Sequence, residues 1–355
     1  MKAYKEYSME SWKIRSIIIL IIVVIITPGR SQIDNDQTII KAGTTAAQFL
    51  KIGVDARSSA MGNASVALPG DVSSIFWNPG GLANIKGIET QFTNSDWLAG
   101  MNFTYIGIAV NYPGIGVLGL SINQLKSPEE PVRTVSDPEG TGAYWDASDF
   151  ALTLTLARRL SDRFSLGGNI KFIQQRIWHS RAQTIALDLG ALFVTPFNNI
   201  RLGAAISNYG GDMQMDGRDL KISVDPDPFN QGTVEFVNAL YETERFPLPL
   251  LFRVGLAGEL FQTDLMRLSF GIDAIHPNDN LEAVNAGLEY ALFETFFLRT
   301  GYANLFRDDS EEGLAFGGGL HYQLRNSSVA LKIDYSYTDF SALGGIPRLS
   351  IGVAF

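Results

Sequence analysis

The chain ends in the sequence Ile346-Pro-Arg-Leu-Ser-Ile-Gly-Val-Ala-Phe355. Large apolar side chains, which are Leu349, Ile351, Val353 and Phe355, alternate here with Arg348, Ser350, Gly352 and Ala354. A period of two residues predicts a β-strand, because successive side chains of a strand point to opposite faces. One face suited to hydrocarbon, one suited to a polar interior and an aromatic last residue are typical of the closing strand of a bacterial outer-membrane β-barrel. A half-buried strand of a soluble protein alternates in the same way, so the rest of the chain has to decide.

The same alternation recurs along most of the chain. Leu152, Leu154 and Leu156 alternate with threonines, and Leu331 and Ile333 alternate with Lys332 and Asp334. We expect strands at 88–97, 101–111, 115–124, 148–159, 164–178, 184–195, 200–209, 248–261, 266–277, 281–291, 296–304, 314–324, 328–338 and 347–355. Most of them approach the ~9–11 residues with which a tilted strand crosses a bilayer, and their number is even, as in bacterial barrels. The sequence therefore predicts an all-β fold over residues 88–355, a 14-stranded antiparallel transmembrane barrel.

The lengths of the expected connections alternate along the chain. Connections after even-numbered strands are short, whereas the long ones, including Leu125–Ala147 and Gly210–Pro247, follow odd-numbered strands. Outer-membrane barrels have short periplasmic turns and longer extracellular loops. We therefore expect a multi-pass barrel in the outer membrane of a Gram-negative type of cell, with both termini in the periplasm and the lipid bilayer around its apolar face. Phe355, at the last outward position, is expected to be the C-terminal insertion signal.

Inward-facing positions of the expected strands carry charges of both signs. These are Lys171, Asp188, Arg253, Glu259, Asp273, Glu289, Arg299, Lys332, Asp334 and Arg348. We expect them to fill the interior as paired or solvated groups rather than to form a selective ion path. Aromatic residues near strand ends, such as Trp97 and Phe340, indicate either interfacial girdles or cross-strand aromatic packing.

Residues 1–31 have the pattern of a signal peptide. Lys13 and Arg15 precede the apolar run Ile17–Ile26, Pro28 ends the run, and Ser31 is a small residue at a plausible cleavage site. This run is much shorter than the ~20 apolar residues that a membrane-spanning helix requires. We therefore expect cleavage near Ser31 rather than a membrane anchor.

Residues 32–87 do not follow the barrel pattern and are rich in small side chains. Asp55 is placed to cap a short helix that Gly62 would end, and a second helical turn is expected at 72–76. Asn78, Pro79 and Gly80 form a tight turn after it. Because small side chains pack inside a barrel without filling it, we expect this segment to be a plug.

Two strings in this segment resemble the PorV/PorQ family of outer-membrane proteins. They are Phe49-Leu-Lys-Ile-Gly-Val-Asp-Ala-Arg-Ser-Ser-Ala-Met-Gly-Asn-Ala and Ser74-Ile-Phe-Trp-Asn-Pro-Gly-Gly-Leu-Ala. The residues that carry the motif are Asp55, Ala56, Arg57, Met61, Gly62, Phe76 and Trp77. That family is related in architecture to the FadL long-chain fatty-acid transporters, whose 14-stranded barrel has an N-terminal hatch with an Asn-Pro-Ala turn. Asn78 and Pro79 match that turn, and Gly80 departs from its alanine.

The resemblance implies two functions of different classes. PorV-like members associate with the type IX secretion translocon and receive exported proteins, and PorQ-like members occur in the same system. The loop Gly210–Pro247, with the apolar residues Val234, Phe236 and Leu240 among acidic ones, is a reasonable docking surface for such partners. The alternative is a FadL-like channel for uptake of hydrophobic small molecules. We prefer the secretion role at this point, because the charged, glycine-rich lumen is unlike a mostly apolar ligand pocket.

Composition excludes several other classes. A net charge of −9 leaves no basic face for nucleic acid, and the absence of cysteine excludes a disulfide framework and a thiolate metal site. Neither a His-Glu-x-x-His nor a Gly-x-Ser-x-Gly motif occurs. We therefore expect no enzyme activity, no metal and no cofactor.

Overall fold

The computed structural model describes residues 41–226, 229, 236–307, 310–325 and 327–355. The expected signal peptide at 1–31, residues 32–40 of the expected plug, and Val234 lie outside the described residues.

Residues 41–87, which we call the plug, contain four short helical segments: η1 (Gln48–Lys51), α2 (Ala56–Ala60), α3 (Ser74–Trp77) and η2 (Pro79–Asn84). The Asp55 carboxylate caps α2 by accepting a hydrogen bond of 2.7 Å from the backbone N–H of Ser58. Beyond its end, Gly62 adopts a φ of 64°, in the left-handed region that favours glycine. Within the described residues, no helix has both the length and the apolar character that a membrane crossing demands.

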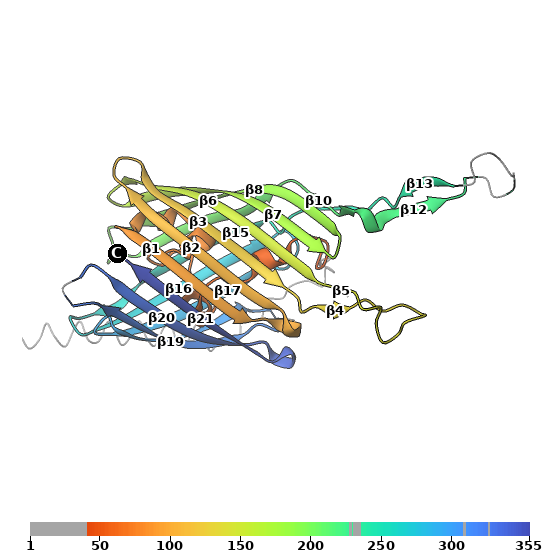
Figure 1. Cartoon of the computed structure of the whole chain (residues 1–355). Helices are drawn as coiled ribbons and strands as arrows, with labels where there is room; N and C mark the ends of the chain where they lie inside the picture. Colours follow the sequence, from red (N-terminus) through yellow and green to blue (C-terminus); the bar gives the residue numbers. More distant parts are fainter. Residues whose placement is uncertain (1–40, 227–228, 230–235, 308–309, 326) are drawn as a thin grey trace, which may run out of the picture. The chain divides into compact units, whose positions relative to one another are not determined.

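Long antiparallel strands make up most of the remaining chain (Figure 1). They are β1 (Ile88–Asp96), β2 (Asn102–Tyr112), β3 (Gly116–Lys126), β6 (Ala147–Ser161), β7 (Phe164–Ile177), β8 (Ser180–Val194), β9 (Arg201–Gly210), β15 (Leu251–Gln262), β16 (Met266–Pro277), β17 (Ala283–Leu292), β18 (Phe296–Leu305), β19 (Leu314–Gln323), β20 (Ala330–Asp339) and β21 (Gly345–Ala354). Each pairs with its neighbours along the chain, β9 pairs with β15, and β1 pairs with β21. The result is a closed 14-stranded antiparallel barrel, which confirms the predicted fold class.

The predicted strand boundaries are close to the observed ones, with two instructive differences. Strand β8 begins at Ser180 rather than at 184, because the two-residue connection at 178–179 lets Ile177 and Ser180 stay paired. Strand β15 begins at Leu251 rather than at 248. Pro247 and Pro249 precede it, and proline has no N–H to donate to a β-ladder.

The barrel has two different ends. The end that holds Ile88, Phe355 and the turns at 113–115, 162–163, 195–200, 263–265, 293–295 and 324–329 is the short-turn end. The end that holds the connections at 97–101, 127–146, 178–179, 211–250, 278–282, 306–313 and 340–344 is the long-loop end. The alternation of short and long connections expected from the sequence is therefore present only in part. The longest connections, at 127–146 and 211–250, lie at the long-loop end, but those at 97–101, 178–179, 278–282 and 340–344 are shorter than the turn at 195–200.

The two faces of the strands are assigned as predicted. On β6, Leu154 and Leu156 are exposed on the outside, whereas Thr153 and Thr155 are buried inside. On β21, Leu349 and Ile351 are exposed, whereas Arg348 and Ser350 are buried. An apolar outer face and a polar inner face belong to a membrane barrel rather than to a soluble sandwich, whose apolar faces meet in the core.

Short strands that the sequence did not indicate lie in the two long loops. The loop at 127–146 contains β4 (Glu130–Pro131) paired with β5 (Tyr144–Trp145). In the loop at 211–250, β10 (Met213–Gln214) pairs with β14 (Arg245–Phe246), and β11 (Asp216–Gly217) extends the edge of β8. Strand β12 (Lys221–Val224) pairs with β13 (Val237–Leu240), and this hairpin, which we call the arm, projects beyond the barrel (Figure 1).

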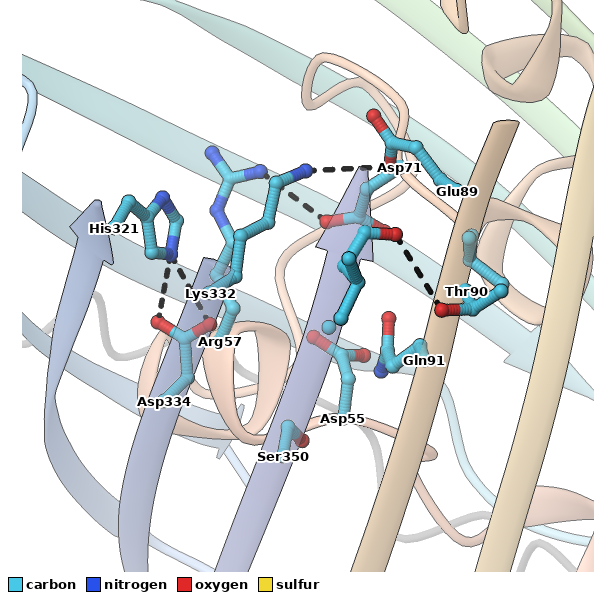
Figure 2. Close-up of a pocket in the computed structure, with 13 residues that line it drawn as sticks. Asp55, Arg57, Asp71, Glu89, Thr90, Gln91, His321, Lys332, Asp334 and Ser350 are labelled. Atoms are coloured by element: carbon cyan, nitrogen blue, oxygen red, sulfur yellow. Dashed lines mark hydrogen bonds and ion pairs between the residues drawn. The ribbon is translucent and has the colours of Figure 1, made fainter. Parts of the chain in front are cut away.

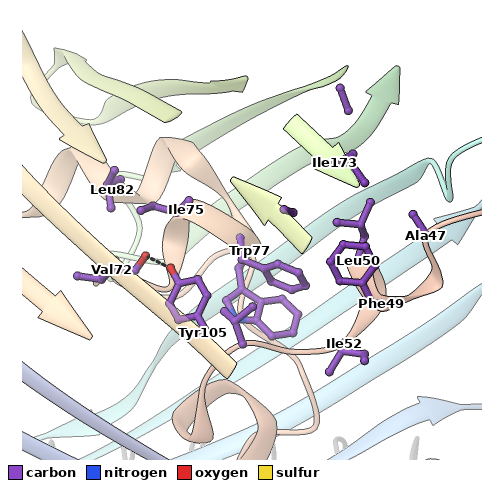
Figure 3. Close-up of a cluster of buried hydrophobic side chains, with 14 of the residues drawn as sticks. Ala47, Phe49, Leu50, Ile52, Val72, Ile75, Trp77, Leu82, Tyr105 and Ile173 are labelled. Carbon is purple, nitrogen blue, oxygen red and sulfur yellow. Dashed lines mark hydrogen bonds between the residues drawn. The ribbon is translucent and has the colours of Figure 1, made fainter. Parts of the chain in front are cut away.

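The hydrophobic core lies between the plug and one part of the inner wall (Figure 3). Phe49, Leu50, Val72 and Trp77 of the plug share one buried cluster with Tyr105 of β2. The Tyr105 hydroxyl also donates a hydrogen bond of 3.1 Å to the Val72 carbonyl. The plug therefore lies inside the barrel and packs against its wall.

Candidate functional site

Close backbone contact with glycines holds the plug against a large part of the wall. The backbone of Met61 lies so near Gly301 of β18 that a Cβ on residue 301 would overlap it. The backbone of Pro79 lies equally near Gly167 of β7. Equivalent backbone approaches of the plug occur at Gly203, Gly271 and Gly287, and the side chains of Asn78 and Pro79 approach Gly190 as closely. With Gly167 and Gly301 these four glycines form what we call the glycine belt. The sequence showed a glycine-rich lumen but did not predict the belt.

The turn at Asn78, Pro79 and Gly80 anchors the plug to β8. The Asn78 side-chain amide donates hydrogen bonds to the carbonyl of Val66 at 2.7 Å and to that of Ala191 at 2.9 Å. Its Oδ1 accepts a hydrogen bond from the Gly80 N–H. An alanine at Gly80 would place its Cβ 2.7 Å from the Gly190 carbonyl oxygen, so glycine at this position permits the close approach to the wall.

The motif residues of the plug meet one another and the wall. The Asp55 carboxylate accepts a hydrogen bond of 2.7 Å from Trp77 Nε1, although the two residues are far apart in the sequence. Trp77 contacts Phe76 edge to face, with ring centroids 4.8 Å apart. The Ala56 N–H donates to the Ser350 hydroxyl at 2.9 Å. These residues therefore order the plug and dock it.

A buried charge network joins α2 to the wall. Arg57 Nε lies 2.9 Å from Glu289 Oε2, and Arg299 Nε lies 2.8 Å from the same oxygen. Arg299 also pairs with Asp334, and Arg57 lies 3.6 Å from Asp71 (Figure 2). For Glu289, Arg299 and Asp334 the network agrees with the expectation that inward charges pair, since an unpaired buried charge is strongly destabilising. The buried Arg253, Asp273 and Arg348, which were expected to be paired or solvated as well, form no ion pair within the described residues.

A second ionic contact tethers the plug at the long-loop end. Lys51 Nζ lies 2.8 Å from Asp279, and the same carboxylate accepts hydrogen bonds from Thr45 and Gln48. Burial acts to raise the pKa of Asp279, but these hydrogen bonds and the Lys51 charge outweigh it and lower the pKa. The tether is therefore an ion pair at neutral pH.

A cavity of about 380 Å³, which we call the loop-side pocket, lies between the plug and the long-loop end. Phe49, Ile52, Trp97, Met101, Leu125 and Phe340 form its apolar side. Trp97 and Phe340 meet edge to face with centroids 5.4 Å apart. These two aromatic residues therefore contact each other between two connections of the long-loop end and line the pocket, so they belong neither to an outward-facing girdle nor to a cross-strand pair.

The lining of the loop-side pocket also has a polar part. It carries Arg348, Thr338, Asn63 and Glu312. The Asn63 side-chain amide donates a hydrogen bond of 2.7 Å to Glu312. Burial raises the pKa of the Glu312 carboxyl, against the lowering effects of this hydrogen bond and of Arg348 and Arg307.

A second cavity, which we call the turn-side pocket, lies on the short-turn side of α2 (Figure 2). Its volume of about 30 Å³ is room for about two water molecules, and its lining is polar. Asp55, Asp71, Glu89, Lys332, Asp334 and Ser350 surround it. A space this small and polar does not suit an apolar ligand.

The remaining residues singled out from the sequence lie at the two ends of the barrel. Phe355 exchanges backbone hydrogen bonds with Ile88 at the short-turn end, and its side chain is exposed. Phe236 and Leu240 are exposed at the arm. None of these three approaches the pockets, and their expected roles stay predictions.

Comparison with known proteins gives a likeness of fold. No family profile and no curated protein matches this sequence. The Ralstonia pickettii toluene transporter TbuX is 13% identical and covers 85% of this chain and 97% of its own, with a TM-score of 0.51. A Pseudomonas aeruginosa FadL homologue is 12% identical, with coverages of 85% and 98% and a TM-score of 0.50. The monoaromatic hydrocarbon channel CymD is 11% identical, with coverages of 85% and 98% and a TM-score of 0.52.

The fold is thus that of a membrane β-barrel of the FadL type, resembling outer-membrane proteins. The three solved structures are a transporter, a FadL homologue and a channel, and none is described as an enzyme. None of them is a PorV/PorQ protein, so that assignment from residues 49–83 stays a prediction.

Proposed function

We propose that this protein is an outer-membrane channel that captures small hydrophobic molecules in the loop-side pocket for uptake. The observation that carries the proposal is the apolar part of that pocket's lining, which includes Phe49 of the plug and the contacting pair Trp97 and Phe340. The sequence favoured a secretion role because the lumen looked too polar for a ligand. The pocket meets that objection in large part, because its apolar residues come from the plug and the loops, except for Leu125 near the end of β3.

The size and chemistry of the pocket suit a small aromatic or aliphatic molecule. About 380 Å³ falls within the ~300–1,000 Å³ that is common for ligand pockets. Aromatic walls bind apolar guests by removing apolar surface from water and by offset or edge contacts. The similar barrels named as a toluene transporter and a monoaromatic hydrocarbon channel add support for a ligand of this class.

The proposed direction of uptake follows from the connections. Barrels of this kind place long loops outside the cell and short turns in the periplasm. The loop-side pocket would then face the external medium, and the plug would stand between a captured molecule and the periplasm. Phe355, at the short-turn end, would lie in the periplasm, whereas the first described residues of the plug lie at the long-loop end, where Thr45 and Lys51 contact Asp279.

Toluene binding to the purified, detergent-solubilised protein, measured by calorimetry, tests the proposal. We expect binding by the natural chain and a loss of at least tenfold in affinity for Phe340→Ser, since about 1.4 kcal/mol of lost aromatic contact corresponds to tenfold. Phe236→Ser on the arm is the matched control and should bind normally. Normal toluene binding by the folded Phe340→Ser variant would overturn the proposal.

A specific observation keeps the secretion role as a second candidate. Phe236, Val237, Leu240 and Tyr241 are all exposed on or beside the arm, which projects from the barrel (Figure 1). Apolar side chains in such a place suit contact with another protein. The resemblance of residues 49–83 to the PorV/PorQ family names the type IX translocon and its exported proteins as the partners.

Two variants measured in two assays separate these functions. The secretion role predicts that Phe236→Ser combined with Leu240→Ser leaves the barrel folded and blocks surface attachment of exported proteins, whereas Phe340→Ser does not. The channel role predicts that Phe340→Ser loses toluene binding and uptake, whereas the arm variant keeps both. Unchanged secretion in the arm variant, together with lost toluene binding in Phe340→Ser, would exclude the secretion role in favour of the channel.

A further inference from the structure

The plug meets the wall in a different way on β20, β21 and β1 than on the glycine belt. The inward positions of these three strands include small hydroxyl side chains beside charged ones such as Asp334 and Arg348, and no glycine of these strands has the plug backbone among its nearest neighbours. We call the buried set Thr93, Ser95, Ser336, Thr338 and Ser350 the hydroxyl wall. Here the Ala56 N–H of the plug meets the Ser350 hydroxyl rather than a glycine.

Both pockets lie along the hydroxyl wall. The loop-side pocket is lined by Thr338 and Arg348, and the turn-side pocket by Asp334 and Ser350. Arg348 and Ser350 are successive inward positions of β21, which places them about 7 Å apart along the strand. The two pockets also follow each other along the plug, because Gly53 lines the loop-side pocket and Asp55 lines the turn-side pocket.

Each pocket reaches solvent at its own end of the barrel. Lys51, at the edge of the loop-side pocket, keeps 27% of its side chain exposed. Lys332 and Glu89, which face the lumen at the turn-side pocket, keep 28% and 20%. Only a thin partition therefore separates two hydrated spaces.

The partition consists of Arg348 and the first turn of α2. The Arg348 guanidinium donates to the Ser59 hydroxyl and lies 5.9 Å from the Trp97 ring centroid. At the start of α2, the Ala56 N–H donates a hydrogen bond of 2.9 Å to Ser350 Oγ. Ser350 Oγ in turn lies 2.8 Å from Thr93 Oγ1. Among the described residues, no carboxylate lies within ion-pair distance of the buried Arg348.

We propose that the hydroxyl wall is a closed path for small hydrophilic solutes and ions, and that Arg348 is its gate. Arg348 Nε and Ser336 Oγ are among the ten buried side-chain atoms that have no hydrogen-bond partner within the described part of the chain, a set that also includes Arg253 Nε and Ser207 Oγ outside the path. Such atoms are usually satisfied, and water entering the path would satisfy the two that lie along it. The path goes beyond the proposed uptake of hydrophobic molecules, since Arg348, Ser350 and Asp334 make it polar beyond the apolar lining of the loop-side pocket.

Conductance of the purified protein in planar lipid bilayers tests the gate. We expect little ion conductance from the natural chain and the appearance of stable conductance in Arg348→Ala, because truncation joins the two pockets. Arg253→Ala is the matched control. Arg253 is equally buried and lies 5.5 Å from the Trp77 ring, but it stands on β15, between strands of the glycine belt. The Arg253→Ala variant should show as little ion conductance as the natural chain.

The absence of cysteine allows the path to be located. In the Arg348→Ala background, Ser350→Cys should make the conductance fall when a bulky methanethiosulfonate reagent is added. Ser207→Cys, a buried position on β9, should not respond. Heat-modifiable migration establishes that each variant is folded, and Arg348→Gln replaces Arg348→Ala if the latter does not fold.

Three results would overturn the gate: a folded Arg348 variant without conductance, equal conductance from Arg253→Ala, or conductance that the thiol reagent does not change at position 350. The assay contains no hydrophobic ligand. Its outcome is therefore independent of whether toluene binds to the loop-side pocket.

Discussion

Replacing Glu289 by glutamine should be among the most damaging single substitutions in this barrel. The Glu289 side chain is buried between three guanidinium groups: Arg57 at 2.9 Å, Arg299 at 2.8 Å and Arg267 at 3.2 Å. Glutamine preserves the shape but removes the charge that these groups share. Removing one partner of a buried ion pair costs ~3–5 kcal/mol, and total stabilities are usually ~5–15 kcal/mol.

Glu294→Gln provides the matched control for this prediction. Glu294 also binds Arg267, at 2.7 Å, but its side chain is 58% exposed. Exposed pairs contribute only ~0–1 kcal/mol. Denaturant unfolding of both variants in detergent, followed by tryptophan fluorescence, gives the two free energies of unfolding. Equal losses for Glu289→Gln and Glu294→Gln would refute the role assigned to the buried network.

Three further predictions concern the outer face, the chain end and pH. Leu154→Arg, at the middle of the outer face of β6, should lower the free energy of unfolding in lipid by ~2–4 kcal/mol. Leu160→Arg, near the rim of the same face, should lower it by only ~0–1 kcal/mol. Similar losses at the two depths would contradict the membrane placement. Deletion of Phe355 should reduce insertion without affecting export, and normal levels in outer-membrane fractions would show that Phe355 is not the insertion signal. Because the pKa of Asp279 is lowered in the folded chain, its contribution to stability is present above its ordinary value of 3.8 and is lost as the pH falls through the folded pKa. Asp279→Asn should therefore lose less stability on acidification from pH 5 than the natural chain does, and parallel pH profiles would count against the tether.

The sequence alone determined the barrel and its two faces. A period of two residues is a local property of each strand, so the outward Leu154 and the inward Thr153 follow from neighbouring residues without any knowledge of pairing. Connection lengths are equally local, which is why the strand number and the two longest loops could be read in advance. The cap at Asp55 and the helix end near Gly62 also depend on a few adjacent residues.

The tertiary structure alone decided which residues meet inside the lumen. Asn63 meets Glu312, and Ala56 meets Ser350, only because the ring closes between β1 and β21 in one register with the plug inside it. Gly301 could not be told from a turn glycine until Met61 was placed against it. The arm escaped prediction because strands of four residues are too short for an alternation to stand out. Contacts between residues hundreds of positions apart depend on strand register and barrel closure, and no local pattern encodes either of them.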